Sequence, residues 1–285
     1  MKNKSFAVLI LTHGRPDRVY TYETLRKSGY TGNIYLVVDD LDKTVEKYKE
    51  KYADKVIVFD KKAISKTFDQ GDNFNDMRAI IYARNASFEV AKKIGLEYFI
   101  QLDDDYTSFQ IRFNRSFDYR PKTLKNLDHV FDSFVDFLKE TSVDSLAMAQ
   151  GGDFIGGEDS TMGGRIRLKR KCMNSFVCST KKPFKFVGRI NEDVNTYTHL
   201  ASKGLLLFTT NQVNLNQMQT QTNAGGMTDL YLNSGTYVKS FYSIIFHPSG
   251  VKIGVLRGTS GAQRLHHNVN WKHTTPMILR ESVKK

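Results

Sequence analysis

Cysteine is scarce in this sequence, and other features of secreted and membrane proteins are missing. The 285 residues include only Cys172 and Cys178, which supply neither a disulfide framework nor a zinc-ligand set, so we interpret them as reduced thiols. No run of about 18 apolar residues occurs, and Met1–Lys4 leads directly into a short apolar segment instead of a signal peptide. The sequence predicts no secretion, no membrane partner and a cytoplasmic location.

Acidic residues are scarce between positions 160 and 280. That stretch has 16 Lys and Arg but only Glu192, Asp193 and Asp229 as acids, which gives a net charge of +13. Residues 1–159 hold 24 basic and 26 acidic residues, a net charge of −2, and the whole chain carries +12. A basic half joined to a neutral half indicates an anionic partner, most commonly a nucleic-acid backbone. A general bias toward lysine would produce the same excess.

Phosphate-binding glycine motifs are also absent from the basic half. The glycines at 151–164 have neither the GxGxxG spacing nor a following Lys-Ser/Thr, so we interpret them as loops. Arg165–Lys171 alternates charged and apolar residues, which predicts a strand that displays a basic face to phosphates. Several aromatic residues of this half could stack on or hydrogen-bond to bases. They are Tyr197, Tyr231, Tyr237 and Trp271.

Apolar segments in the first half predict buried strands. Ser5–Leu11 is a continuous apolar run, typical of a strand buried on both faces of a parallel sheet. Asn33–Val38 and Lys55–Phe59 follow, with a charged helix between them. Strand and helix alternating at this spacing predict parallel crossovers and an α/β fold. Because ligands bind beyond the carboxyl ends of such strands, the turn Thr12–Arg18 is a candidate binding loop.

Three consecutive aspartates follow another buried strand. Tyr98–Leu102 runs directly into Asp103, Asp104 and Asp105, and upstream, Tyr82–Gly95 predicts an amphipathic helix with a C-terminal glycine cap. Adjacent carboxylates repel one another, so the fold must supply a cation, and rigidly placed carboxylate oxygens suit a hard divalent metal. An acidic triplet alone is more often a solvated turn or a helix cap.

The order Ala83-Arg84-Asn85, helix, strand, Asp103-Asp104-Asp105 resembles the core of nucleotide-sugar glycosyltransferases of the GT-A fold. More narrowly, the chain is similar to the TET-associated glycosyltransferases of bacteriophages, which are implicated in glycosylating hydroxymethylated bases in DNA. The resemblance to the GT-A core covers roughly residues 5–210. It implies a Rossmann-like, mostly parallel twisted sheet flanked by helices, with a mixed C-terminal region on the acceptor side.

The resemblance implies that a nucleotide-sugar, with a UDP-sugar expected, is held near the first two strands. Thr12, His13 and Arg15 would lie at the nucleotide, and Asp39 or Asp40 would accept hydrogen bonds from its base or ribose. His13 could instead be a turn residue that bonds its own backbone. Either aspartate could instead cap the next helix.

Arg84 and Asn85 are further candidates for binding the donor. Near the start of its helix, the Arg84 guanidinium can contact a diphosphate through two N–H groups, and Asn85 can bond a ribose or a carboxylate. A surface salt bridge is the alternative for Arg84.

The resemblance also implies a metal site. Asp103 and Asp105 would ligate Mn²⁺ or Mg²⁺, and Asp103 and Asp104 would also face the donor. A histidine late in the chain often completes the metal shell in GT-A enzymes, although no spaced metal-histidine motif is evident here. The candidates are His266, His267 and, in reserve, His247.

Two of the three acids in the basic stretch stand together as Glu192-Asp193, before a predicted helix over Val194–Ser202. They could simply place favourable charge at a helix N-terminus, an effect of about 0.3–1 kcal/mol. By resemblance to the acidic motif opposite the metal in GT-A enzymes, they are catalytic, with Asp193 as the general base if transfer inverts the anomeric centre.

The sequence thus predicts a metal-dependent glycosyltransferase that acts on a hydroxymethylated pyrimidine, such as 5-hydroxymethylcytosine, in phage DNA and works in the host cytoplasm. We expect residues 1–150 to form the nucleotide-sugar-binding core and residues 151–285 to form a basic acceptor-binding portion of the same domain. Three alternatives stay open: a glycosyltransferase for a glycan or protein acceptor, a non-catalytic DNA-binding module, and a nucleotidyltransferase. The oligomeric state is not predicted.

Overall fold

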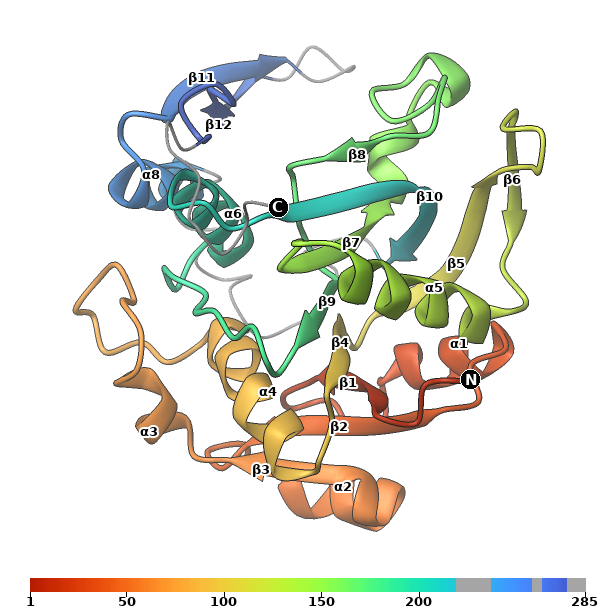
Figure 1. The fold of residues 1–285 in the computed structure, drawn as a ribbon. Helices are drawn as coiled ribbons and strands as arrows, with labels where there is room; N and C mark the ends of the chain where they lie inside the picture. Colours follow the sequence, from red (N-terminus) through yellow and green to blue (C-terminus); the bar gives the residue numbers. More distant parts are fainter. Residues whose placement is uncertain (219–236, 258–262, 276–285) are drawn as a thin grey trace.

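The apolar run at the start of the chain forms strand β1 (Phe6–Leu11), which lies inside the large sheet of the protein (Figure 1). In the computed structural model, which describes residues 1–218, 237–257 and 263–275, all six side chains of β1 are buried. Alternate residues of β1 point into two different apolar cores, one on each face of the sheet. This is the two-sided burial that a continuous apolar strand predicts.

Nine further strands complete this sheet, and two more form a separate ribbon. Their bounds are β2 (Asn33–Asp39), β3 (Val56–Phe59), β4 (Tyr98–Asp103), β5 (Tyr106–Phe113), β6 (Tyr119–Thr123), β7 (Ser145–Gln150), β8 (Leu168–Lys169), β9 (Phe176–Ser179), β10 (Leu207–Gln217), β11 (Val251–Arg257) and β12 (Gln263–Val269). The order in the large sheet is β3-β2-β1-β4-β9-β7-β10-β5-β6, and β8 pairs with β10. Strands β1 to β4 are mutually parallel, whereas β9 is antiparallel to both of its neighbours and β5 is antiparallel to β10 and β6.

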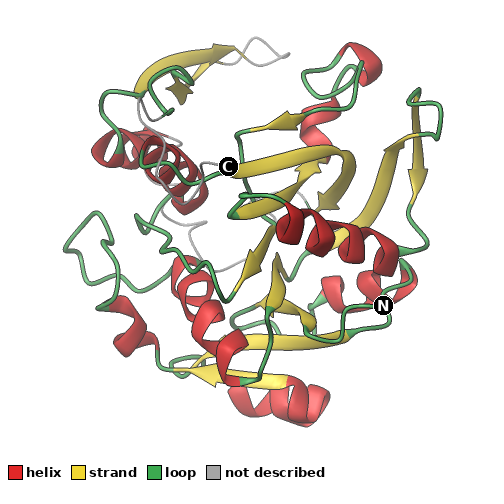
Figure 2. Cartoon of the chain, in the orientation of Figure 1, coloured by secondary structure: helices red, strands yellow, loops and turns green. Residues whose placement is uncertain are grey.

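Helices cover both faces of the large sheet (Figure 2). One face packs against α1 (Tyr20–Lys27), α2 (Val45–Tyr52) and α5 (Leu127–Glu140), and the other against α3 (Lys61–Ser65), α4 (Ile81–Lys93) and α6 (Glu192–Ser202). Helix α8 (Tyr237–Phe246) lies against α6 and the β11–β12 ribbon. Short 3-10 turns are η1 (Ala53–Lys55), η2 (Gly151–Phe154) and η3 (Gly157–Asp159). The predicted α/β class with a flanked, partly mixed sheet is confirmed.

Several predicted boundaries differ from the observed elements. Strand β5 pairs on both sides, with β10 and β6, and β6 forms the edge. The expected strand over Arg165–Lys171 shortens to β8. Strand β10 is long, and its register against β7 shifts between Thr210 and Asn214. Local alternation cannot show these pairings, because they depend on distant strands. Among the described helices, none has the length and apolarity needed for a membrane span.

Candidate active site

The carboxyl ends of the parallel strands bring the predicted loops together. Asp103 ends β4 opposite Leu11, the last residue of β1. Asp104 follows in a turn and is 5% exposed; its carboxylate accepts hydrogen bonds from Thr12 Oγ1 at 2.6 Å and Arg15 Nη1 at 3.2 Å. Thr12, Arg15 and Asp104 therefore join the loop after β1 to the end of β4. Since both Asp104 oxygens are occupied, its role here is to fix this loop.

Arg84 links three elements at the end of β4. It is 1% exposed, and its Nη2 donates to Asp103 Oδ1 at 3.1 Å while its Nε donates to Glu192 Oε1 at 3.0 Å. The guanidinium also lies over the Phe176 ring, 5.0 Å from the centroid. Burial alone would lower the pKa of Arg84, but the charges of Asp103 and Glu192 raise it. Among the partners that the structure describes, none hydrogen-bonds Nη1, which is buried.

Negative charge is concentrated around this guanidinium. Burial, followed by the charges of nearby aspartates, raises the pKa of Asp103 to about 7 despite Arg84. Burial and then Asp193 raise the pKa of Glu192 to about 7, and burial and then Asp104 raise the pKa of Asp105 to about 6. Burial is the largest cause of each raised pKa, and the charges of neighbouring carboxylates add to it. A bound cation would offset both.

Helix α6 supplies the second acidic pair in its first turn. The backbone of Asn191, just before the helix, has a left-handed φ of 61°, and its side chain donates to Ser243 Oγ of α8 at 2.6 Å. Asp193 is 7% exposed and accepts a hydrogen bond from the backbone N–H of Val194 at 2.7 Å. Its charge contributes to the raised pKa of Asp103. The fold therefore places the acids of α6 beside those of β4, 89 residues earlier in the chain.

These residues suit a hard divalent cation. Within 1–218, 237–257 and 263–275, no three Asp, Glu, His or Cys side chains form a complete protein cage for a metal. Mg²⁺ commonly needs only one or two carboxylates, with substrate phosphates and water completing its shell. Asp105 fits that use, because it is half-buried and, among the described residues, no other side chain hydrogen-bonds or ion-pairs with its carboxylate, which has only a backbone hydrogen bond from its own residue. Asp103 has its second oxygen available beside it.

A second polar cluster lies at the ends of β2 and β3. Asp39 is buried and contacts His13 Nδ1 at 2.7 Å and Lys61 Nζ at 3.3 Å. Burial would raise the pKa of Asp39, but the His13 hydrogen bond and the Lys61 charge lower it. Asp42 accepts a hydrogen bond from the backbone N–H of Gly14 at 2.6 Å. The His13 side chain is 55% exposed, so this cluster presents a polar surface beside the loop after β1.

A family model matches residues 6–226 and is described as TET-Associated Glycosyltransferase. The chain belongs to this family. The match confirms the resemblance that the Arg-Asn and triple-aspartate motifs indicate, and with it the prediction of a glycosyltransferase. No curated protein matches the chain.

Solved structures with similar folds were also found. S. aureus TarS is 12% identical with a TM-score of 0.44, and the match covers 75% of this chain but 37% of TarS. Glucosyl-3-phosphoglycerate synthase from Mycobacterium tuberculosis, solved with Mg²⁺ and UDP, is 11% identical with a TM-score of 0.44, covering 95% and 92% of the two chains. Mannosyltransferase PcManGT from Pyrobaculum calidifontis, with GDP-Man and Mn²⁺, is 10% identical with a TM-score of 0.45, covering 86% and 73%.

In this TET-associated glycosyltransferase, Asn85 does not have the expected contact with a donor. It is fully buried, donates to the backbone carbonyl of Phe186 at 3.1 Å and accepts from the Phe186 N–H at 2.8 Å. Asp40 accepts a hydrogen bond from the backbone N–H of Lys61, the first residue of α3, at 2.9 Å. Asp60 is the N-cap of α3 and the N-cap of α2 is Thr44, so neither aspartate caps the next helix. Asp40 instead joins the end of β2 to the start of α3, while Asp39 lies in the polar cluster.

The expected metal-binding histidines lie elsewhere. His266 and His267 are on β12, within the ribbon at the upper left of Figure 1, whereas β4 is near the centre. Burial, then His266, Lys239 and Lys171, lower the pKa of His267 to about 3, so its neighbours are cations. The reserve candidate, His247, contacts the His273 carbonyl through Nε2 at 3.2 Å. His266 and His267 lie on a ribbon that packs on α8, and His247 directly follows α8. Among the described residues no metal-binding group of three such side chains forms, so none of the three histidines joins the aspartates in one.

The basic stretch is less accessible than its sequence suggests. Within 165–171, Arg167 donates to the Gly163 carbonyl, Lys169 to the Thr161 carbonyl and Arg170 to the Trp271 carbonyl, while Lys171 pairs with Asp153 at 2.9 Å. Four of the five cations in this stretch are bound by the protein itself and Arg165 is exposed, so the basic face is smaller than expected. Of the expected base-stacking residues, Tyr197 is 2% exposed and stacks on Trp271, Tyr237 is half-exposed, and Tyr231 lies outside the described residues.

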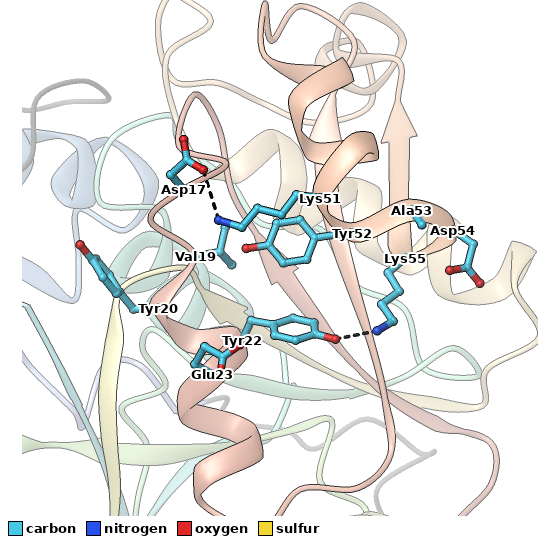
Figure 3. A pocket seen from close by; sticks show the side chains of 10 residues that line it. All are labelled: Asp17, Val19, Tyr20, Tyr22, Glu23, Lys51, Tyr52, Ala53, Asp54 and Lys55. Atoms are coloured by element: carbon cyan, nitrogen blue, oxygen red, sulfur yellow. Dashed lines mark hydrogen bonds and ion pairs between the residues drawn. The ribbon is translucent and has the colours of Figure 1, made fainter.

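A pocket of about 470 Å³ lies between α1, the end of α2 and η1 (Figure 3). Tyr22 and Tyr52 form part of its wall, Lys55 donates to the Tyr22 hydroxyl at 2.7 Å, and Lys51 pairs with Asp17 at 3.2 Å. None of the predicted site residues lines it.

Sequence reasoning missed two residues of the site. Lys61 is 6% exposed, pairs with Asp39 and lies 5.4 Å from the centroid of the Tyr82 ring. Asp42 holds the loop after β1. The position of Lys61 two residues after β3 was a usable signal, because strand ends line the binding edge of such sheets.

Proposed function

We propose that this protein transfers a sugar from a nucleotide-diphospho-sugar to the hydroxyl of a hydroxymethylated pyrimidine in DNA. The observation that carries the proposal is the Arg84 centre, in which one buried guanidinium joins Asp103 of β4 to Glu192 of α6. This contact assembles cationic and carboxylate groups suited to a diphosphate and a metal at one strand end, in a chain that belongs to a glycosyltransferase family.

The donor nucleotide is proposed to lie over the ends of β1 and β2. His13 and Asp39 would contact its base or ribose, because His13 is exposed and Asp39 is fixed by Lys61. Arg15 would face the phosphates, since its guanidinium is partly exposed and only one of its N–H groups is used by Asp104. Thr12 supports this arrangement through its bond to Asp104.

Charge compensation of the leaving nucleoside diphosphate is the main catalytic need in this reaction. Asp103 and Asp105 would hold the divalent metal, Mn²⁺ or Mg²⁺, which supplies positive charge to the diphosphate when bound. The unpartnered Nη1 of Arg84 can donate to the same anion, and Glu192 holds the guanidinium in that orientation. We therefore propose a positioning role for Glu192.

Asp193 is the proposed general base. As the bond between the anomeric carbon and the diphosphate oxygen breaks, the acceptor oxygen bonds to that carbon and its proton passes to Asp193. The products are the glycosylated pyrimidine and a nucleoside diphosphate. In this proposal the acceptor oxygen attacks the anomeric carbon from the face opposite the leaving group, so the anomeric centre inverts.

A DNA acceptor is supported by the family description and by the net charge of +13 over 160–280. We propose that residues 1–150 provide most donor contacts and residues 151–285 the base and further acceptor contacts. The target nucleotide would leave the duplex to reach Asp193, as in other enzymes that modify a base.

Nucleoside mass spectrometry tests this function directly. The protein is incubated with Mn²⁺ or Mg²⁺, a panel of UDP- and GDP-sugars, and duplex DNA containing either 5-hydroxymethylcytosine or cytosine. We expect a hexose-sized mass increase only on the hydroxymethylated nucleoside, together with release of nucleoside diphosphate.

Matched acceptors and a matched variant complete the design. Oligosaccharide and peptide acceptors offered in parallel would identify the glycan or protein alternative, and released pyrophosphate would identify nucleotidyl transfer. Asp193→Asn serves as the control for enzyme-independent transfer. Modification of sugars or peptides with none on DNA would contradict the proposed acceptor.

A further inference from the structure

Strands β5 and β6 form a two-stranded hairpin at the edge of the large sheet, and its turn points away from the body in Figure 1. The Asn114 side chain organises the turn. Its Oδ1 accepts hydrogen bonds from the backbone N–H groups of Ser116 and Asp118, both at 2.9 Å, and its Nδ2 donates to Asp118 Oδ2 at 2.9 Å. The tip is therefore a defined structure held by its own side chains.

Phe117 occupies an unfavourable position at this tip. Its φ is 67°, in the left-handed region, and its side chain is 68% exposed. Three of the other four described non-glycine residues with positive φ are asparagines, which tolerate this conformation better than bulky residues. A phenylalanine here gains little burial and carries backbone strain. Such strain at an exposed residue points to a functional contact outside the chain.

The cations of the hairpin are available, unlike most of those at 165–171. Arg115, Arg120 and Lys122 are exposed, and none has a carboxylate partner among the described residues. Asp118 is the only acid between 112 and 123, and Asn114 binds it. Arg120 and Lys122 are two residues apart on β6 and so share one face of the ribbon.

The base of the hairpin is rigidly attached to the sheet. Arg112 is 9% exposed, donates to Asn214 Oδ1 at 2.6 Å and to the Tyr119 hydroxyl at 3.1 Å, and lies 4.2 Å from the centroid of the Phe154 ring. The Tyr119 ring stacks on Phe154. Strand β5 begins directly after Asp105, so the hairpin and the three aspartates belong to one continuous stretch of chain.

We propose that the β5–β6 hairpin is an arm that enters the major groove of the acceptor DNA and holds the duplex at a distance from the site of transfer. A two-stranded ribbon fits that groove, and its three free cations match the phosphates beside it. Phe117 contacts the bases or their methyl groups at the tip. This inference rests on the proposed DNA acceptor and adds a second contact, which the expected basic face at 165–171 does not provide.

The length of β5 sets the reach of the arm. Its eight residues span roughly 26 Å at about 3.3 Å per residue. At about 3.4 Å per base pair, that is about eight base pairs of duplex. A DNA with only four base pairs on each side of the target therefore cannot contact both the site and the tip, whereas one with sixteen can.

The test compares kcat and KM on these two duplexes for the wild type, Phe117→Ala, and the triple variant Arg115→Ala/Arg120→Ala/Lys122→Ala. Both variants should raise KM at least tenfold on the long duplex, with kcat unchanged, and leave KM on the short duplex within twofold. The triple variant should also reduce the slope of log KM against log salt by up to about 3, near 0.9 per phosphate contact.

Matched controls separate this role from a structural one. Phe241→Ala removes another exposed phenylalanine, on α8. Lys47→Ala/Lys92→Ala/Lys93→Ala removes three exposed charges on α2 and α4, and these helices lie on the opposite side of the molecule from the hairpin in Figure 1. Both control variants should have the kcat and KM of the wild type on the long and the short duplex. Phe117→Gly should raise the unfolding temperature, because glycine relieves the strain, and still raise KM on the long duplex.

Two results would overturn the proposal. The arm is refuted if the wild type modifies the long duplex and the hairpin variants have the same KM as the wild type on it. The arm is also refuted if the variants raise KM equally on the long and short duplexes. In both cases the proposed DNA acceptor stands. If the wild type modifies no DNA and uses a glycan or peptide instead, the acceptor assignment and the arm fail together.

Discussion

Replacing Arg84 by methionine is the most direct test of the charge arrangement at the candidate site. Methionine keeps an apolar contact with Phe176 but removes the cation between Asp103 and Glu192. Removing one partner of a buried ion pair typically costs about 3–5 kcal/mol, because the remaining charge is left uncompensated. Here two carboxylates lose the same partner, so we expect the free energy of unfolding to fall by at least about 3 kcal/mol at pH 8.

The loss should depend on pH in a defined direction. The pKa values of Asp103 and Glu192 are already raised to about 7, and they rise further without Arg84. A carboxyl whose pKa is raised in the folded state begins to destabilise the fold when the pH exceeds its pKa in the unfolded chain, near 4. The destabilisation is complete when the pH exceeds its pKa in the folded protein. Arg84→Met should therefore be less destabilising at pH 5, where these groups are protonated, than at pH 8.

Urea denaturation in EDTA at pH 5 and pH 8 measures both effects. Glu192→Gln is the matched control, because glutamine keeps an oxygen for the Arg84 Nε–H while removing one negative charge from the cluster. We expect it to change the free energy of unfolding by less than about 1 kcal/mol. A loss below 1 kcal/mol for Arg84→Met at pH 8, or an equal loss at both pH values, would refute the reasoning.

Three further predictions concern individual carboxylates. Asp105→Ala should abolish metal-dependent transfer with an unchanged circular dichroism spectrum, because no other described side chain hydrogen-bonds or ion-pairs with its carboxylate; normal turnover would remove it as a ligand. Asp193→Asn should bind donor normally by calorimetry yet lose transfer at least about 100-fold, as expected for a general base; undiminished rates would exclude that role. Asp39→Asn should be less stable than the wild type at pH 7, with the difference shrinking below about pH 4 as wild-type Asp39 protonates; a pH-independent difference would show that its ion pairs with His13 and Lys61 are not responsible.

The strands and their ends were predictable from local sequence. The apolar run of β1 requires burial on both faces, and the Asp103–Asp105 triplet directly after β4 places carboxylates at the binding edge. Position relative to a strand end depends only on neighbours in the chain. The same reasoning located Glu192 and Asp193 in the first turn of α6.

Partners far apart in the chain were decided only by tertiary packing. Arg84 pairs with Glu192 across 108 residues, and Asn85, its neighbour, turns instead to the backbone of Phe186. Nothing local distinguishes these two polar residues, because a helix turns about 100° per residue and each meets a different element.

The histidines on β12 show the same limit. His266 and His267 have the chemistry of metal ligands, but β12 pairs with β11 on α8 and lies apart from the aspartates. The sequence thus determined which elements form and which side chains stand at their ends. Only the folded chain decided which of those side chains meet, because such contacts depend on how whole helices and strands pack against one another.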